Sequence, residues 1–130
     1  MLSYGFTKEL DVPFEEAEEK VREGLKKEGF GILTVIDVKE KFKEKLGIDF
    51  KKYIILGACN PSNAYKAILS EENIGLMLPC NVIVYDKNSK TAVSIIKPSA
   101  AMGMIDNEEL KTVAEEVEAR LKRVFDSLGR

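Results

Sequence analysis

The chain has 130 residues, 45% of them apolar, and its 20 basic and 22 acidic side chains leave a net charge of −2. This length is typical of one domain, so we expect residues 1–130 to form a single domain whose core needs neither disulfides nor metals. The balanced charge offers no basic surface for nucleic acid, and the absence of histidine excludes Ser-His-Asp and Cys-His catalysis and imidazole metal ligands.

A strand and a long helix are predicted at the start of the chain. Leu2, Tyr4 and Phe6 alternate with small or polar residues, which is the period-two pattern of a strand with one buried face. After Pro13, apolar residues recur at helical spacing among charged ones, and Gly29 stands where a helix C-terminus favours glycine. The helical apolar positions are Phe14, Ala17, Val21 and Leu25.

An apolar run at residues 32–38 predicts the second strand. It is β-branched and apolar on both faces, which is expected of an interior strand of a sheet. Asp37 lies within this run, and we interpret it as a strand-end acid that caps the following turn. Residues 39–46 place Phe42 and Leu46 four apart, which is typical of a short helical insert.

The third strand, which is also expected to be buried, is predicted at residues 53–59 and is followed by another short helix. Asn60 is a good N-cap residue and Pro61 suits the first helical position, so we expect a helix that runs to about Leu69. This helix is the second insert between strands.

The last part of the chain predicts a hairpin and a second long helix. Residues 81–85 and 92–96 are rich in β-formers and are separated by the polar segment 86–90, which indicates two antiparallel strands. Asp106 with Glu109 three residues later suggests a capping box at the start of the final helix. Its apolar positions are Leu110, Val113, Ala114, Val117, Leu121, Val124, Phe125 and Leu128.

This order of elements predicts an α+β fold of the form β-α-β-β-β-β-α, with short helical inserts after the second and third strands. Consecutive strands have no regular helical crossovers between them, so we expect an antiparallel sheet. Both long helices are then expected on one face of that sheet.

Antiparallel pairing of the third and fourth strands would bring two thiols to one end of the sheet. Cys59 ends the third strand and Cys80 begins the fourth, and the fifth strand returns to the same end with residues 98–104. We therefore expect a small ligand or a protein partner to bind there. The candidate binding residues are Cys59, Asn60, Pro79 and Cys80.

Other functions of the cysteines stay open, and the sequence does not decide whether the chain is an enzyme. Cys59 precedes a helix N-terminus, where the dipole favours a lowered thiol pKa, so a thiol-redox protein with Cys80 as the resolving thiol is one alternative. A soft-metal site for an ion like Cu(I) is another, with Met102 and Met104 as further ligands. Both thiols can also pack simply as small apolar side chains.

Asp37 is a further ligand-binding candidate, although the strand order predicts that it lies at the opposite end of the sheet from Cys59. A single site that used both residues would need a dimer or a different strand order.

The expected location of the chain is the cytoplasm. The sequence has neither a basic leader with an apolar segment nor an apolar run long enough to cross a bilayer, so we expect reduced thiols and no membrane partner. Abundant Lys and Glu with few amide side chains indicate a heat-adapted source.

The two cysteine segments, 56–61 and 75–82, together with residues 29–34 and 36–38, resemble the DUF302 family of small bacterial and archaeal proteins. The resemblance implies a curved antiparallel sheet like half of the TATA-binding protein, and often a homodimer. It implies no activity or cofactor, because the family has no established one. Its characteristic positions are Asp37, Cys59, Asn60, Pro61, Leu78, Pro79 and Cys80.

Overall fold

The structure is a computed structural model that describes residues 3–129. Its strands are β1 (Gly5–Leu10), β2 (Gly31–Asp37), β3 (Tyr53–Cys59), β4 (Cys80–Lys87) and β5 (Lys90–Ile96). Its helices are α1 (Phe14–Lys27), α2 (Val38–Leu46), α3 (Pro61–Ser70), the 3-10 helix η1 (Glu72–Met77), α4 (Pro98–Met102) and α5 (Glu108–Ser127). Leu2, which the alternation pattern assigns to the first strand, lies outside the described residues, and that strand begins at Gly5.

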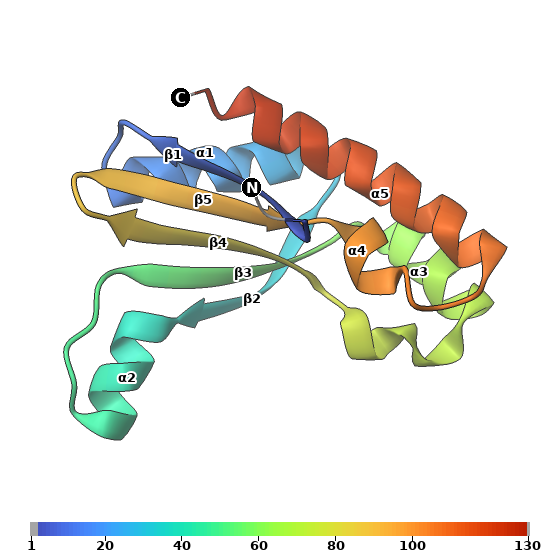
Figure 1. Cartoon of the computed structure of the whole chain (residues 1–130), viewed down its shortest axis with the longest axis horizontal. Helices are drawn as coiled ribbons and strands as arrows, with labels where there is room; N and C mark the ends of the chain where they lie inside the picture. Colours follow the sequence, from blue (N-terminus) through green and yellow to red (C-terminus); the bar gives the residue numbers. More distant parts are fainter. Residues whose placement is uncertain (1–2, 130) are drawn as a thin grey trace.

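The strands form one antiparallel sheet in the order β1-β5-β4-β3-β2 (Figure 1). β2 to β5 follow one another as a meander, and β1 pairs with β5 at the far edge. The α+β prediction is therefore confirmed, with α2 inserted after β2 and with α3 and η1 inserted after β3.

The main core lies between the sheet and the two long helices α1 and α5. Apolar side chains of both helices meet those of the central strands, and burying each large one stabilises the fold by about 1.5–3 kcal/mol. The two helices cross closely at Gly24, where a Cβ atom would lie 3.0 Å from Cγ1 of Val124. Fully buried examples are Val21, Leu25, Leu56, Val82, Val84, Val93, Ile95 and Leu121.

The expectation that residues 32–38 form an interior strand is wrong, because β2 is an edge strand. Leu33, Val35 and Ile36 are 66%, 49% and 43% exposed. Apolar residues on both faces are typical of strands with neighbours on each side. Here the pattern marks a strand that has a neighbour, β3, on one side alone.

Two turns differ in detail from the sequence prediction. The hairpin is tighter than the polar segment 86–90 suggests, because Lys87 already pairs with Lys90 and Asn88 adopts the positive φ of 59° that a two-residue turn requires. Asn107, not Asp106, caps α5. Its Oδ1 accepts from the Leu110 N–H, and its Nδ2 donates to the carbonyl of Ser70, which the neighbouring Asp106 carboxylate could not do.

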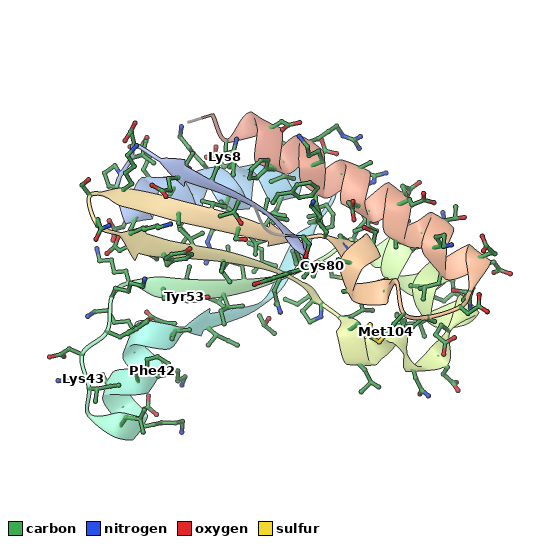
Figure 2. The ribbon with its side chains drawn as sticks, in the orientation of Figure 1. Lys8, Phe42, Lys43, Tyr53, Cys80 and Met104 are labelled. Atoms are coloured by element: carbon green, nitrogen blue, oxygen red, sulfur yellow. The ribbon has the colours of Figure 1, made fainter. Side chains whose placement is uncertain are left out.

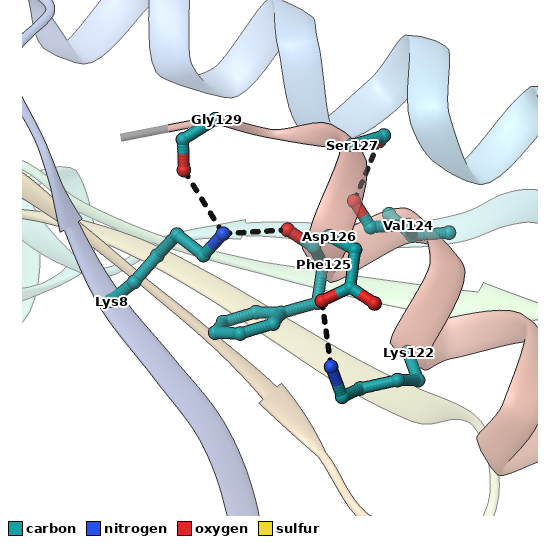
Figure 3. A network of polar contacts seen from close by, with 7 residues as sticks. All are labelled: Lys8, Lys122, Val124, Phe125, Asp126, Ser127 and Gly129. Atoms are coloured by element: carbon teal, nitrogen blue, oxygen red, sulfur yellow. Dashed lines mark hydrogen bonds and ion pairs between the residues drawn. The ribbon is translucent and has the colours of Figure 1, made fainter.

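The C-termini of both long helices are closed by specific residues. Gly29 follows α1 with a φ of 84°, which confirms its role as the helix stop. At the end of α5, Lys8 of β1 donates from Nζ to the carbonyls of Phe125 (2.9 Å) and Gly129 (3.0 Å) (Figure 3). The ammonium also lies 4.2 Å from the centre of the Phe125 ring. A cation thus neutralises the helix terminus and ties it to the sheet edge.

Candidate functional site

The two cysteines lie at the same end of the sheet. Cys80 pairs with Ala58, so Cys59 is one position beyond the direct partner of Cys80, and both line one interior cavity. Figure 2 shows Cys80 where the sheet gives way to the short helices. The predicted convergence of these two strand ends is therefore found in the fold, and both thiols are free.

The short helices and α5 line the side of the interior cavity opposite the sheet. α3 contributes Ala67, α4 contributes Met102 and α5 contributes Val117, opposite the sheet-end residues. Its volume is about 30 Å³. That is room for a water molecule or two, not for an organic ligand, and an apolar lining of this kind favours a dry cavity.

A larger cleft of about 330 Å³ lies on the outer side of the same residues. Its lining comes from η1, the first residues of β4, the end of β5 and α4. Four side chains line both the cleft and the interior cavity and so form the wall between them: Leu78, Cys80, Pro98 and Met102.

Both thiols are less acidic than a free cysteine. Burial, and to a smaller extent the nearby Cys59, raises the pKa of Cys80 to about 11. Burial also raises the pKa of Cys59. The expectation that the helix N-terminus lowers the pKa of Cys59 is therefore wrong, because loss of solvent around the sulfur raises this pKa. Both side chains are neutral thiols at pH 7.

Asn60 organises the backbone at this end of the sheet. Its Oδ1 accepts from the N–H of Asn63 (3.3 Å) and from the Ser62 hydroxyl (3.2 Å), which confirms it as the N-cap of α3. Its Nδ2 donates to the carbonyl of Gly29 (3.2 Å), so it also joins the end of α1 to α3. These bonds occupy both polar ends of the amide and hold the segment that follows Cys59 in place.

Pro79 lines the outer cleft and packs against β3. It follows a cis peptide bond from Leu78, and its ring lies close to Gly57. Of the predicted candidates, Pro79 and Cys80 therefore line the cleft, whereas Cys59 and Asn60 line the interior cavity behind it.

Asp37 does not belong to this site. It pairs with Ile54, whereas Gly31 at the other end of β2 pairs with Cys59. Its Oδ1 accepts from the N–H of Glu40 at 3.0 Å, which confirms that it caps α2.

The proposed metal ligands are only partly brought together. Met102 is 8% exposed and lines both the cavity and the cleft, whereas Met104 is 79% exposed and lines neither. Within residues 3–129 no group of three or more Cys, Asp or Glu side chains is arranged to hold a metal ion.

Sequence reasoning identified the thiols of this site but not most of its walls. Ile96, Pro98 and Ala101 line the cleft through apolar surfaces that carry no motif. The one available signal was topological, since the return of β5 predicts that residues 98–104 reach this end.

Comparisons with known proteins agree with this architecture. The family described as "Domain of unknown function DUF302" matches residues 6–128. A crystal structure of an uncharacterized conserved DUF302 protein from Bacillus stearothermophilus is 34% identical, with a TM-score of 0.90 over 98% of this chain and 99% of the other. Among curated proteins, none is significantly similar. None of the helices in residues 3–129 combines the length and apolar character that a bilayer crossing requires.

Proposed function

The chain belongs to the DUF302 family, which has no assigned activity, and from the site itself we propose that it binds a small, mainly apolar ligand in the cleft beside Cys80. The observation that carries this proposal is the cleft of about 330 Å³ at the end of the sheet. Pockets that hold small molecules begin at about 300 Å³ and are mostly apolar.

The lining indicates the chemistry of the ligand. Leu76, Met77 and Ile96 are among the apolar side chains, no charged side chain contributes, and the single amide is Asn81. A ligand with an apolar body and one hydrogen-bonding group matches this lining, because an ionised group would lose solvation without a partner. The thioether of Met102 and the thiol of Cys80 add polarisable surface.

The geometry gives less support to the alternative thiol-redox function. A nucleophilic thiol must ionise, and burial raises the pKa of both Cys59 and Cys80. A soft-metal function would have to rely on Cys59, Cys80 and Met102, because Met104 faces solvent. We propose a cytoplasmic location as well, with which two free thiols are compatible.

The test is a titration with indole and with cyclohexanol, an aromatic and an aliphatic probe that each carry one hydrogen-bonding group. Amide chemical shifts in the NMR spectrum are expected to change at Ile96, Asn81 and Ala101. Ala101→Phe places a ring in the cleft and is expected to weaken binding about tenfold or more. Ala100→Phe, next to it on the same helix but outside the cleft lining, is the matched control.

Equal binding to both phenylalanine variants, or shift changes confined to other surfaces, would contradict the proposal. Rapid alkylation of either cysteine at pH 6–7 would instead favour the redox alternative.

A further inference from the structure

The outer cleft and the interior cavity share a wall. Leu78, Cys80, Pro98 and Met102 line both spaces. Cys80 is short and Pro98 is a rigid ring, whereas the side chain of Met102 is long and unbranched and rotates about several bonds. A change of rotamer at Met102 is therefore the simplest way to open this wall.

The backbone that carries Met102 is fixed at both ends of α4. At the start of the helix, the N–H of Ser99 donates to Oε1 of Glu118 on α5 (2.9 Å). At its end, the carbonyl of Met102 accepts from the N–H of Ile105 (3.1 Å). Met102 itself is 8% exposed, so its side chain fills space inside the protein. Opening the wall thus moves one side chain and leaves the helix in place.

Asn63 offers a hydrogen-bond acceptor to the interior cavity. This residue of α3 lines the cavity and is 2% exposed. Its Nδ2 donates to Oδ1 of Asn60 (3.2 Å), whereas no donor within residues 3–129 bonds to Oδ1 of Asn63. A buried acceptor without a donor costs free energy, so a ligand that donates to this oxygen is stabilised there.

From these observations we propose that the cleft and the cavity are two chambers of one site, which join when Met102 turns aside, and that the ligand is an unbranched alkyl chain ending in a hydroxyl group. The hydroxyl donates to Oδ1 of Asn63 in the cavity. The chain crosses the wall at the place of Met102, and its tail lies in the cleft beside Met77 and Ile96. Binding of this kind rests on the proposed function of the cleft and narrows the ligand to one class.

The shape and charge of the two chambers select this class. The side chain of methionine is itself an unbranched chain, so the space that Met102 leaves admits a straight chain but no ring. Beyond it, the cavity of about 30 Å³ has room for a terminal hydroxyl. Among the described residues, none that lines either chamber is charged, so a carboxylate or an ammonium group would lose its solvation without a partner.

Titration of the full chain with n-hexanol and with its isomer methyl pentyl ether tests the hydrogen bond. The two molecules have the same composition, but the ether has no donor. n-Hexanol is expected to bind about tenfold more tightly, because it alone satisfies Oδ1 of Asn63. In NMR spectra its methylene protons are expected to show NOEs to methyl groups of Ala67 and Val117, which line only the cavity, and of Ile96, which lines only the cleft.

Cyclohexanol tests the role of Met102. In the parent protein its NOEs are expected at Ile96 and not at Val117, because a ring does not pass the wall. Met102→Ala widens the passage, so NOEs from cyclohexanol to Val117 are expected in this variant. Met104→Ala is the matched control, because Met104 is 79% exposed and lines neither chamber. It is expected to behave as the parent does.

Contacts of n-hexanol that are confined to the cleft would overturn the two-chamber site and leave the proposed function intact, whereas no binding of any of the three molecules would overturn both. Equal affinity for the alcohol and the ether also overturns the two-chamber site. So do cyclohexanol contacts with Val117 in the parent, or their absence in a folded Met102→Ala protein. Circular dichroism shows whether that variant is folded, and the comparison of alcohol with ether decides the matter without it.

Discussion

The ring of Pro79 lies against the backbone of Gly57, so close that a Cβ atom at Gly57 would stand 2.7 Å from Cγ of Pro79. The same atom would overlap the hydroxyl of Thr34 on the neighbouring strand β2. Pro79 reaches the outer cleft from this position. Because Gly57 has no side chain, the Pro79 ring can lie against β3, and this contact helps to fix the position of the cleft wall.

Gly57→Ala is expected to destabilise the protein by about 1–3 kcal/mol, because the added methyl group must displace the proline ring as well as Thr34. Urea unfolding followed by circular dichroism measures this loss. Gly31→Ala is the control, since Gly31 also lies in a strand but a Cβ atom there meets nothing within 4 Å. Similar losses in the two variants would show that steric contact with Pro79 is not the cause.

Lys8→Met is expected to lower the free energy of unfolding by about 1 kcal/mol. The substitution keeps the apolar stem but removes the cation that bonds to the carbonyls of Phe125 and Gly129 at the end of α5. Thermal unfolding of this variant is compared with that of Lys20→Met, a change at an exposed position of α1. A melting temperature of the Lys8 variant at or above that of the control would contradict the prediction.

Alkylation by iodoacetamide should be slow at neutral pH and should modify Cys59 before Cys80. At pH 7 a thiol with a pKa of about 11 is ionised to about one part in ten thousand, and Cys59 is the more exposed of the two. Rates at each cysteine, measured by mass spectrometry of digested samples, should rise with pH, and for Cys80 they should keep rising up to about pH 11. A rate for Cys80 that levels off below pH 9 would contradict this.

The same raised pKa makes stability depend on pH. Because the pKa of Cys80 rises from its ordinary 9.0 to about 11 on folding, the folded state favours the neutral thiol. The resulting stabilisation is complete below about pH 9 and is lost as the pH rises through 11, with a total change of about 3 kcal/mol. The free energy of unfolding of the parent should therefore fall more steeply than that of Cys80→Ala over this window. Parallel curves for the two proteins would rule out this contribution.

Asn60→Ala is expected to cost about 1–3 kcal/mol, because it removes the N-cap of α3 and the bond to the Gly29 carbonyl. Asn60→Asp keeps the capping oxygen and loses the donor, so its loss should be smaller than that of the alanine variant. Chemical unfolding of both variants separates the two contributions. An aspartate variant less stable than the alanine variant would contradict the prediction, because both variants lose the donor to Gly29 and only the aspartate keeps the cap.

Most of the fold could be predicted from local patterns. The helical spacing from Phe14 to Leu25 and the Asn60-Pro61 pair follow from side-chain periodicity and capping, which act within a few residues. The antiparallel sheet was predicted from the lack of regular helical crossovers between consecutive strands, and this pairing brings Cys59 and Cys80 to one end of the sheet. Such inferences succeed because each depends on neighbours in the sequence.

The position of β2 could not be predicted in the same way. An apolar run such as residues 32–38 has the same pattern whether the strand has a neighbour on both edges or on one edge alone. The polarity of the side chains depends on the two faces of a strand and not on its hydrogen-bonding edges. The thiol pKa values raise a similar difficulty. A helix N-terminus is visible in the sequence after Cys59, but the burial that opposes it depends on α3, α4 and α5 closing over the sheet end.

The sequence by itself determined the strands and the two long helices, their order and the meeting of the two cysteine segments, because periodicity and caps are local properties and consecutive strands without regular crossovers pair antiparallel. The tertiary structure alone decided that a cleft opens beside Cys80 and that the apolar strand β2 lies at an edge. These features depend on which distant surfaces cover one another, and solvent exclusion by such surfaces is a property of the packed chain rather than of any segment.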